Sequence, residues 1–292
     1  MNDAAMPAPT RVRPRWLRAL VLIVGLALAY GLTQTLTLTG VELAPLAALP
    51  LGLVATAALV LLYHGLVRWM EGRPAVELAV DRSTAGLGWG GLLGLGFMSV
   101  TVAAIALGGE VTFTRGGAIS AVLGAVGFWI VVGVGEELLF RGAVFRLVEE
   151  RVGSAWALAV SAVLFGAVHL ANPDASLWGA VAIACEAGVM LGAAYLVTRS
   201  LWLPIGVHIA WNFAQGTLFG ASVSGSGIDT GTVLTSTMEG PQWLTGGSFG
   251  PEASVVAVVL GAAMAAVMIV LARRRGNWRT RPRRAAVAEP AS

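Results

Sequence analysis

The sequence predicts an all-α polytopic membrane protein, a bundle of about eight transmembrane helices. Three observations lead to this fold class. Hydrophobic residues make up 57% of the 292 residues and charged residues only 12%, and the mean hydropathy is +0.78. A soluble domain carries roughly twice that share of charge. Eight spans of about 20 residues, with their connections, use nearly the whole chain, so any chemistry must lie among the spans.

Apolar segments long enough to cross a bilayer occur at eight places. They cover residues 17–38, 44–67, 86–107, 117–148, 154–171, 175–197, 201–220 and 253–272. The first follows a group of arginines, as in a signal peptide, but it is too long for one and no cleavage pattern ends it. We therefore expect a cytoplasmic tail at 1–16, a transmembrane helical domain at 17–272 and an arginine-rich cytoplasmic tail at 273–292.

Basic residues alternate along the chain in the way that an even number of spans requires. The chain has nineteen arginines and no lysine. Arginines follow the second, fourth, sixth and eighth spans, whereas the stretch from Ala221 to Glu252, rich in Gly, Ser and Thr, has none. Because cytoplasmic loops are enriched in basic residues, we expect a multi-pass plasma membrane protein with both termini in the cytoplasm.

The arginine tail is interpreted as an anchor to the headgroups of the lipid bilayer. No nucleic-acid-binding module accompanies it, so we expect no nucleic-acid partner. The single cysteine, Cys185, excludes an intramolecular disulfide and a cysteine-based metal cluster.

Polar side chains within the spans are the candidates for function, because each ionisable group costs about 2.5 to 3.5 kcal/mol on insertion. The fourth span carries Glu136, Glu137 and Arg141, the fifth ends at His169, and the seventh carries His208 and Asn212. The sixth carries Glu186. Its sequence leaves two interpretations open, a buried carboxyl bonded to a neighbouring helix or a contributor to a pocket.

Helical geometry gives these spacings a meaning. Glu137 and Arg141 are four residues apart, so they lie on one face and can form an ion pair. Glu136 points about 100° away and has no partner on its own helix at that spacing, which suits a carboxylate kept for water or substrate. His208 and Asn212, also four residues apart, present an imidazole and an amide to one spot.

A hairpin near Gly153 would bring two of the candidates to the same depth. Glu136 lies seventeen residues before this glycine and His169 sixteen after it. His208 lies only nine residues after Arg199, about 13 Å of helix. Either the seventh span starts deeper, or the fourth and fifth extend below the interface.

Each group taken alone also has a purely structural interpretation. The Glu-Glu-Arg group suits an ion pair that locks helices together, and the His and Asn suit hydrogen-bonding contacts between helices. All three groups together favour a functional site enclosed by the bundle.

The motifs Glu136-Glu137-x-x-x-Arg141, Phe165-x-x-x-His169 and His208-x-x-x-Asn212 occur in this order on separate hydrophobic helices. In this form they resemble the motifs of the CPBP family, the CAAX proteases and bacteriocin-processing enzymes also called Abi proteins. Every motif position matches, over about residues 130–215. The resemblance implies an intramembrane endopeptidase, related to the type II CAAX prenyl endopeptidase, that cuts a membrane-associated peptide or protein.

The resemblance also implies roles for these residues. Glu136 would be the general base that activates water, and His169 would hold the same water or share its proton. His208 and Asn212 would stabilise the oxyanion. Glu137 and Arg141 would be a supporting ion pair, with Arg141 alternatively receiving a carboxylate of the substrate.

The role of metal is a separate question, because this family has often been described as intramembrane metalloproteases. Glu136, His169 and His208 are a possible zinc set, since three protein ligands and a water form the usual catalytic site. However, the partner of His208 at four residues is Asn212, a poor zinc ligand and a good amide donor. We predict a glutamate-activated water and no cofactor, with zinc at those three residues as the alternative.

Two other functions remain open at this stage. One is a non-proteolytic membrane scaffold or bacteriocin-immunity partner that keeps the same residues for structure. The other is a proton-coupled transporter with an intramembrane relay, although the chain shows no internal repeat of the kind that such folds usually carry.

Overall fold

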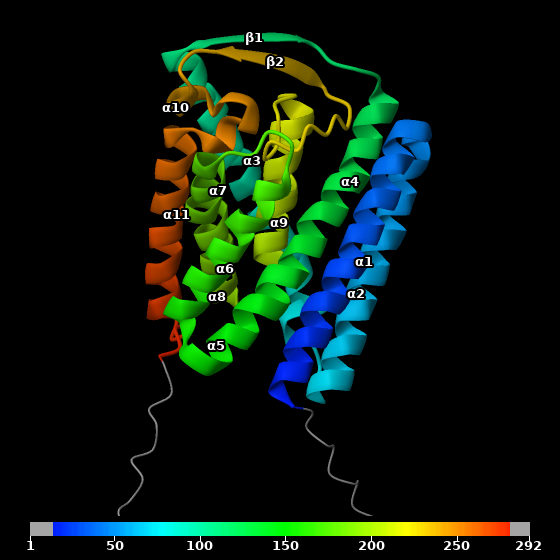
Figure 1. Cartoon of the computed structure of the whole chain (residues 1–292), viewed down its shortest axis with the longest axis vertical. Coiled ribbons are helices and arrows are strands. Elements are labelled where there is room, and N and C mark those ends of the chain that lie inside the picture. The colour runs from blue at the N-terminus through cyan, green and yellow to red at the C-terminus, as the bar shows by residue number, and fades with distance from the viewer. Residues whose placement is uncertain (1–13, 281–292) are drawn as a thin grey trace, which may run out of the picture.

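The computed structural model describes residues 14–280, and it is a bundle of long helices (Figure 1). The helices of the bundle are α1 (Arg15–Leu43), α2 (Pro45–Glu71), α3 (Ser83–Gly108), α4 (Ile119–Glu137), α5 (Arg146–Val152), α6 (Ser154–Val168), α7 (Leu177–Ile183), α8 (Val189–Thr198), α9 (Trp202–Asn212) and α11 (Val255–Arg274). This arrangement confirms the predicted all-α fold class. The outer parts of the predicted tails, 1–13 and 281–292, lie outside the described residues.

Three wide π-helical segments interrupt or extend these helices. They are η3 (Leu138–Phe145) between α4 and α5, η5 (Ala184–Gly188) between α7 and α8, and η6 (Phe213–Leu218) after α9. Segments of this kind are rare and often occur at functional sites. Here each is part of a span for which the sequence predicted a polar residue.

Seven helical segments within residues 14–280 are long and apolar enough to cross a membrane. The predicted seventh span, 201–220, is not among them, because α9 has 11 residues and η6 adds 6. The bundle therefore contains this helix in a shorter form than expected. The fourth segment, Ile119–Val152, has 34 residues, more than the 20 or so that a bilayer requires.

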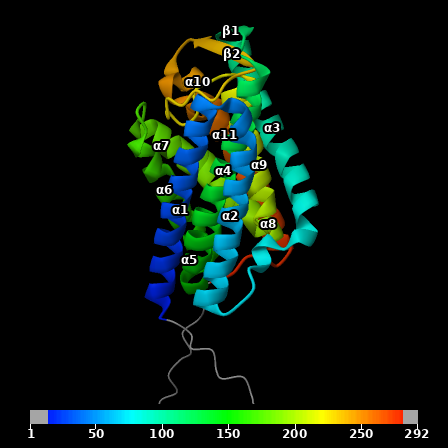
Figure 2. The same cartoon turned by 90° about the vertical axis from the view of Figure 1, so that its right-hand side faces the viewer.

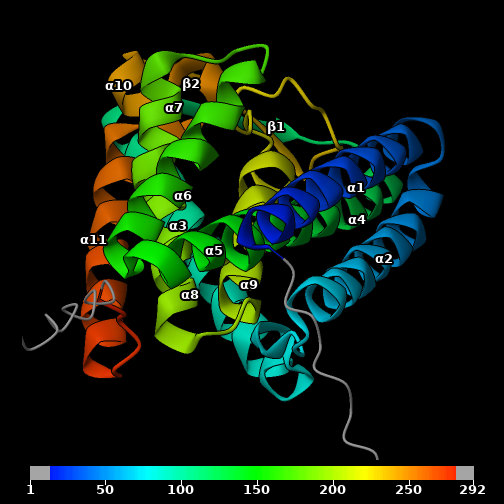
Figure 3. The same ribbon diagram turned by 60° about the horizontal axis from the view of Figure 1, so that its bottom comes forward.

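The helices pack in pairs around the centre of the bundle. α3 packs along α9, α2 along α4, and α8 along α11, while α1 contacts both α2 and α4. Figure 3 shows α1, α2 and α4 on one side of the bundle and α11 on the other. The first turn of α1 and the last turn of α11 lie at the same end (Figure 2).

A two-stranded sheet crosses the opposite end of the bundle (Figure 1). β1 (Glu110–Arg115) pairs antiparallel with β2 (Leu234–Glu239), so that Glu110 lies opposite Glu239. The short helix α10 (Gln242–Thr245) and the turn η8 (Pro251–Ala253) follow β2 and lead into α11. The long polar stretch of the sequence thus covers this end.

Small residues allow the central helices to approach closely. A Cβ atom added at Gly90 or Gly94 of α3 would lie closer than 3.0 Å to backbone atoms of Leu203 or Val207 of α9. Inside a bilayer the hydrophobic effect does not drive helices together, because lipid tails are as apolar as the helix surfaces. Helices there associate through close packing of this kind. The contact fixes α9, which carries two candidate site residues.

The hairpin predicted at Gly153 is present. Gly153 separates α5 from α6 and has φ 87°, a left-handed conformation that glycine adopts without steric cost. Salt bridges hold this end of the bundle together. Arg146 binds Glu71 of α2 at 2.6 Å, and Arg199 binds Glu149 at 2.5 Å.

Replacing Gly94 by alanine should lower the thermal unfolding midpoint of the protein in detergent, because the added Cβ collides with the backbone of α9. The higher helix propensity of alanine, about 1 kcal/mol, will not compensate. Gly96→Ala is the matched control on the same helix, since a Cβ there meets nothing within 4 Å. Equal midpoints for the two variants would contradict this packing.

Candidate active site

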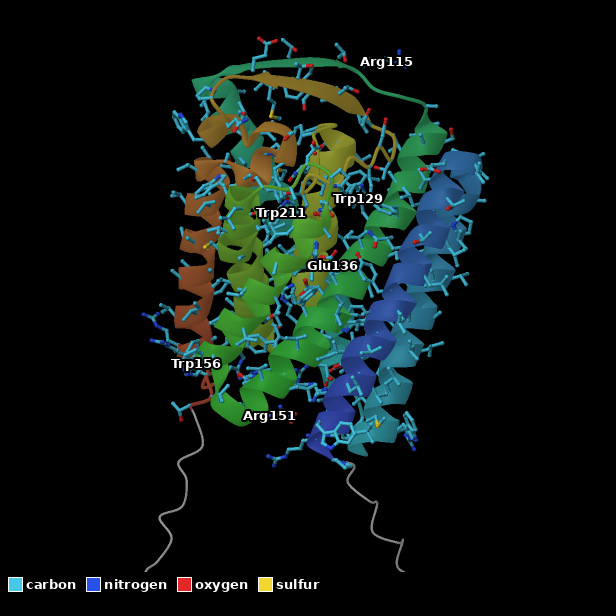
Figure 4. The ribbon with its side chains drawn as sticks, in the orientation of Figure 1. Arg115, Trp129, Glu136, Arg151, Trp156 and Trp211 are labelled. Carbon is cyan, nitrogen blue, oxygen red and sulfur yellow. The ribbon has the colours of Figure 1, made fainter. Side chains whose placement is uncertain are left out.

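The motif residues of three separate spans line one cavity of about 180 Å³. Glu136, His169, His208 and Asn212 all contribute to its wall. Figure 4 shows Glu136 about half-way along the bundle. The structure therefore brings together the four residues for which the sequence predicted chemistry, from α4, the end of α6, and α9.

One carboxylate oxygen of Glu136 accepts a hydrogen bond, and the other has no partner among the described residues. The hydroxyl of Tyr30 on α1 donates to Oε1 at 2.9 Å. Oε2 is buried, has no hydrogen-bond partner among the described residues, and lies 3.8 Å from Nε2 of His208. Gly135 makes room for the ring of Tyr30, since a Cβ there would overlap it. The free oxygen on the cavity wall is what a base for water requires.

Glu137 and Arg141 form the predicted ion pair behind this wall. Nη1 of Arg141 donates to Oε1 of Glu137 at 2.7 Å, and both side chains are fully buried. Nη2 donates to the carbonyl oxygens of Ala187 and Gly188 in η5, at 3.2 and 3.0 Å. Neither residue of the pair lines the cavity. The geometry fits the supporting ion pair and not a guanidinium that receives a carboxylate of the substrate.

The carboxylate of Glu137 also orients His208. Its Nδ1 lies 3.1 Å from Oε1 of Glu137. Because a carboxylate paired with Arg141 only accepts hydrogen bonds, Nδ1 carries the proton and donates. In the neutral ring, Nε2 then presents a lone pair towards Glu136. His208 donates from Nε2 only when it holds a second proton.

His169 is fixed in a similar way, by the backbone. It begins the turn η4 (His169–Ala171) at the end of α6, and its Nδ1 lies 2.7 Å from the carbonyl oxygen of Phe165. Since the carbonyl can only accept, Nδ1 carries the proton and Nε2 is left as an acceptor. A water on the cavity side can donate to it.

Phe165 of the second motif packs between these groups. Its ring centre lies 4.6 Å from the guanidinium carbon of Arg141, 4.9 Å from the ring centre of His169 and 6.0 Å from that of His208. The cation contacts the face of an aromatic ring, an attractive arrangement that strengthens away from water. Phe165 thus packs against the ion pair and against both histidines, so that the positions of these groups depend on one another.

The cavity wall also includes polar residues that were not predicted from the sequence, among them Tyr30, Ser224 and Glu252. The carboxylate of Glu252 accepts the backbone N–H of Ser224, and Asn172 donates to the carbonyl of Ser224 at 2.6 Å. Burial raises the pKa of Glu252 to about 7. No sequence spacing relates these residues to the motifs, because Tyr30 reaches the cavity from α1 and the other two from the folded 221–252 stretch.

Glu186 fits neither of its two predicted interpretations. It is fully buried beside Gly261 of α11. Both of its carboxyl oxygens lack a hydrogen-bond partner among the described residues, and it does not line the cavity. The carboxyl is packed behind the wall rather than in it.

The arrangement does not fit a three-residue metal site. Among residues 14–280, no three side chains of His, Cys, Asp or Glu are grouped closely enough to hold a metal ion. Glu136 and His208 approach one another, but His169 does not complete the predicted zinc set.

Fold and site together define a polytopic helical membrane protein with a Glu, His and Asn set around one cavity. Residues 118–214 match the family described as type II CAAX prenyl endopeptidase Rce1-like, which confirms the resemblance seen in the motifs. The match covers α4 to α9 and all the motif residues, about a third of the chain. Comparisons with curated proteins and with solved structures gave no match.

Glu137→Gln should lower the thermal unfolding midpoint far more than Glu136→Gln. The first change leaves the charge of Arg141 buried and unpaired, which typically costs about 3 to 5 kcal/mol. The second leaves an amide on a cavity wall where one carboxylate oxygen had no partner. Thermal unfolding of both variants in the same detergent measures the difference. A larger loss for Glu136→Gln would show that the ion pair does not support the fold.

Proposed function

We propose that the protein is an intramembrane endopeptidase that hydrolyses a peptide bond in a membrane-associated peptide or protein. The observation that carries this proposal is the single cavity that collects Glu136, His169, His208 and Asn212 from separate spans. The match of residues 118–214 to the CAAX prenyl endopeptidase family supports the same class of reaction.

The geometry suggests how the reaction would proceed. A water between the free oxygen of Glu136 and Nε2 of His169 gives its proton to Glu136 while its oxygen attacks the carbonyl carbon of the peptide. The carbonyl oxygen becomes negative and accepts hydrogen bonds from the amide of Asn212 and from doubly protonated His208. The C–N bond then breaks, and Glu136 returns the proton to the leaving nitrogen.

Glu137 would have an indirect part in this sequence. Its carboxylate lies 3.1 Å from Nδ1 of His208 and accepts a hydrogen bond from it, which orients the imidazole. A cationic His208 is the form that donates to an oxyanion from Nε2. Glu137 therefore acts as a positioning residue, and its ion pair with Arg141 holds it in place.

Cells that contain the wild-type protein should release peptide termini that are absent when Glu136→Gln replaces it, because the amide cannot take a proton from water. The measurement is a mass-spectrometric comparison of membrane peptides from the two strains, with equal amounts of both proteins in the membrane as the control. A non-proteolytic scaffold or immunity partner gives identical termini in both strains, and that result would reject the peptidase.

Activity should survive removal of metal by a chelator, because the described residues offer no three-ligand site. Elemental analysis of the active, chelator-treated protein should find no stoichiometric zinc. If activity is lost with zinc and restored when zinc is added back, then Glu136, His169 and His208 are ligands and the proposed mechanism is wrong.

We also propose that both termini lie in the cytoplasm. The turn from α5 to α6, which carries Arg151, lies at the end of the bundle where α1 begins and α11 ends (Figure 1). Reporter fusions at residue 235, in β2, and at residue 285, outside the described residues, should report opposite sides of the membrane. The same side for both fusions would contradict this topology.

A further inference from the structure

Glu252 is a second carboxyl group in the cavity, outside the segment that matches the peptidase family. It lies in η8, is 1% exposed, and is held from one side by the backbone N–H of Ser224. The cavity is thus closed at this side by an acidic residue that comes from the long polar stretch. Glu252 takes no part in the proposed hydrolysis.

The charges on the cavity wall are unbalanced. Its ionisable residues are Glu136, Glu252, His169, His208 and Tyr30, with no arginine among them. Each arginine of the motif region lies elsewhere, as Arg141 behind the wall shows. A buried carboxylate is costly unless a cation or several hydrogen bonds accompany it. Glu136 has Tyr30 and His208 close by. Glu252 has hydrogen bonds from the neutral groups of Ser224 and Gln215, and His208 stabilises it electrostatically.

A cation that enters the cavity would meet this need. Burial raises the pKa of Glu252 to about 7, although Ser224, Gln215 and His208 act in the opposite direction, so these groups offset only part of the cost of burying the carboxylate. Ser224 and Ser226 line the cavity as well and supply oxygen atoms that accept further N–H groups. A guanidinium or ammonium group has several donors and forms strong hydrogen bonds to a carboxylate.

We propose that Glu252 binds the side chain of an arginine or lysine of the substrate, and so selects peptides that carry a basic residue at a fixed distance from the bond that Glu136 attacks. That this cation belongs to a substrate rests on the proposed peptidase function. The binding of a cation itself rests on the cavity alone.

A cleavage experiment tests the selection. The full chain in lipid vesicles would be given synthetic peptides of Ala, Leu and Val that carry a single Arg, Lys, Gln or Glu at each position in turn. The wild type should cut peptides with Arg or Lys at one position at least ten-fold faster than those with Gln. Glu252→Gln should lose this preference and still cut the Gln peptides.

Glu186→Gln is the matched control, because it changes a neighbouring buried carboxyl that does not line the cavity. It should keep the preference for basic peptides. The subsite is rejected if Glu252→Gln keeps that preference, or if it slows the cleavage of all peptides equally, since the residue would then act on the reaction or the fold.

A binding experiment decides the point without cleavage. Butylguanidinium should raise the thermal unfolding midpoint of the Glu136→Gln protein, and it should not raise that of the Glu136→Gln/Glu252→Gln protein. Butylurea, which has the same shape and no charge, should raise neither. If butylguanidinium shifts both proteins equally, or shifts neither, the cation site is wrong. If it shifts only the first while no peptide is cut, the cation site stands and the peptidase function fails.

Discussion

The ion pair between Glu137 and Arg141 is the interaction on which the rest of the site depends. Each of these charges alone would cost several kcal/mol inside a bilayer, so neither can be placed there without the other. The pair is also extended on both sides. Arg141 donates to two carbonyl oxygens of η5, and Glu137 faces Nδ1 of His208. Three spans are thereby held in one relative position.

The aromatic ring of Phe165 connects this ion pair to a further span, α6. The guanidinium of Arg141 lies over the ring, and the ring contacts His169 and His208. A motif that reads as a phenylalanine four residues before a histidine therefore has a physical basis in both of its positions. The phenylalanine supplies the contact surface and, through its backbone carbonyl, fixes the proton of His169 on Nδ1.

Two parts of the cavity come from outside the segment shared with the peptidase family. Tyr30 reaches Glu136 from α1, where Gly135 leaves room for its ring. Glu252 and Ser224 arrive from the stretch that covers the other end of the bundle. The shared segment thus holds the groups that suit hydrolysis, whereas the rest of the chain shapes and charges the space that a substrate would enter.

The sequence by itself determined the features that depend on local regularity. Hydropathy located the helices, because a bilayer accepts only long apolar segments. The four-residue spacing of Glu137 and Arg141 predicted their pair. The similar distances from Gly153, seventeen and sixteen residues, predicted that Glu136 and His169 would reach the same region of the bundle. Both predictions depend on nothing beyond the pitch of a helix and one turn.

Only the tertiary structure decided the features that depend on contacts between distant parts of the chain. The shortness of α9, the hydroxyl of Tyr30 on Glu136, the protonated nitrogen of His208 and the place of Glu252 all follow from how separate helices and loops pack. Sequence spacing cannot predict these contacts, because the partners are far apart along the chain. Each contact depends on the shapes of the side chains and on how closely the backbones approach in the folded bundle.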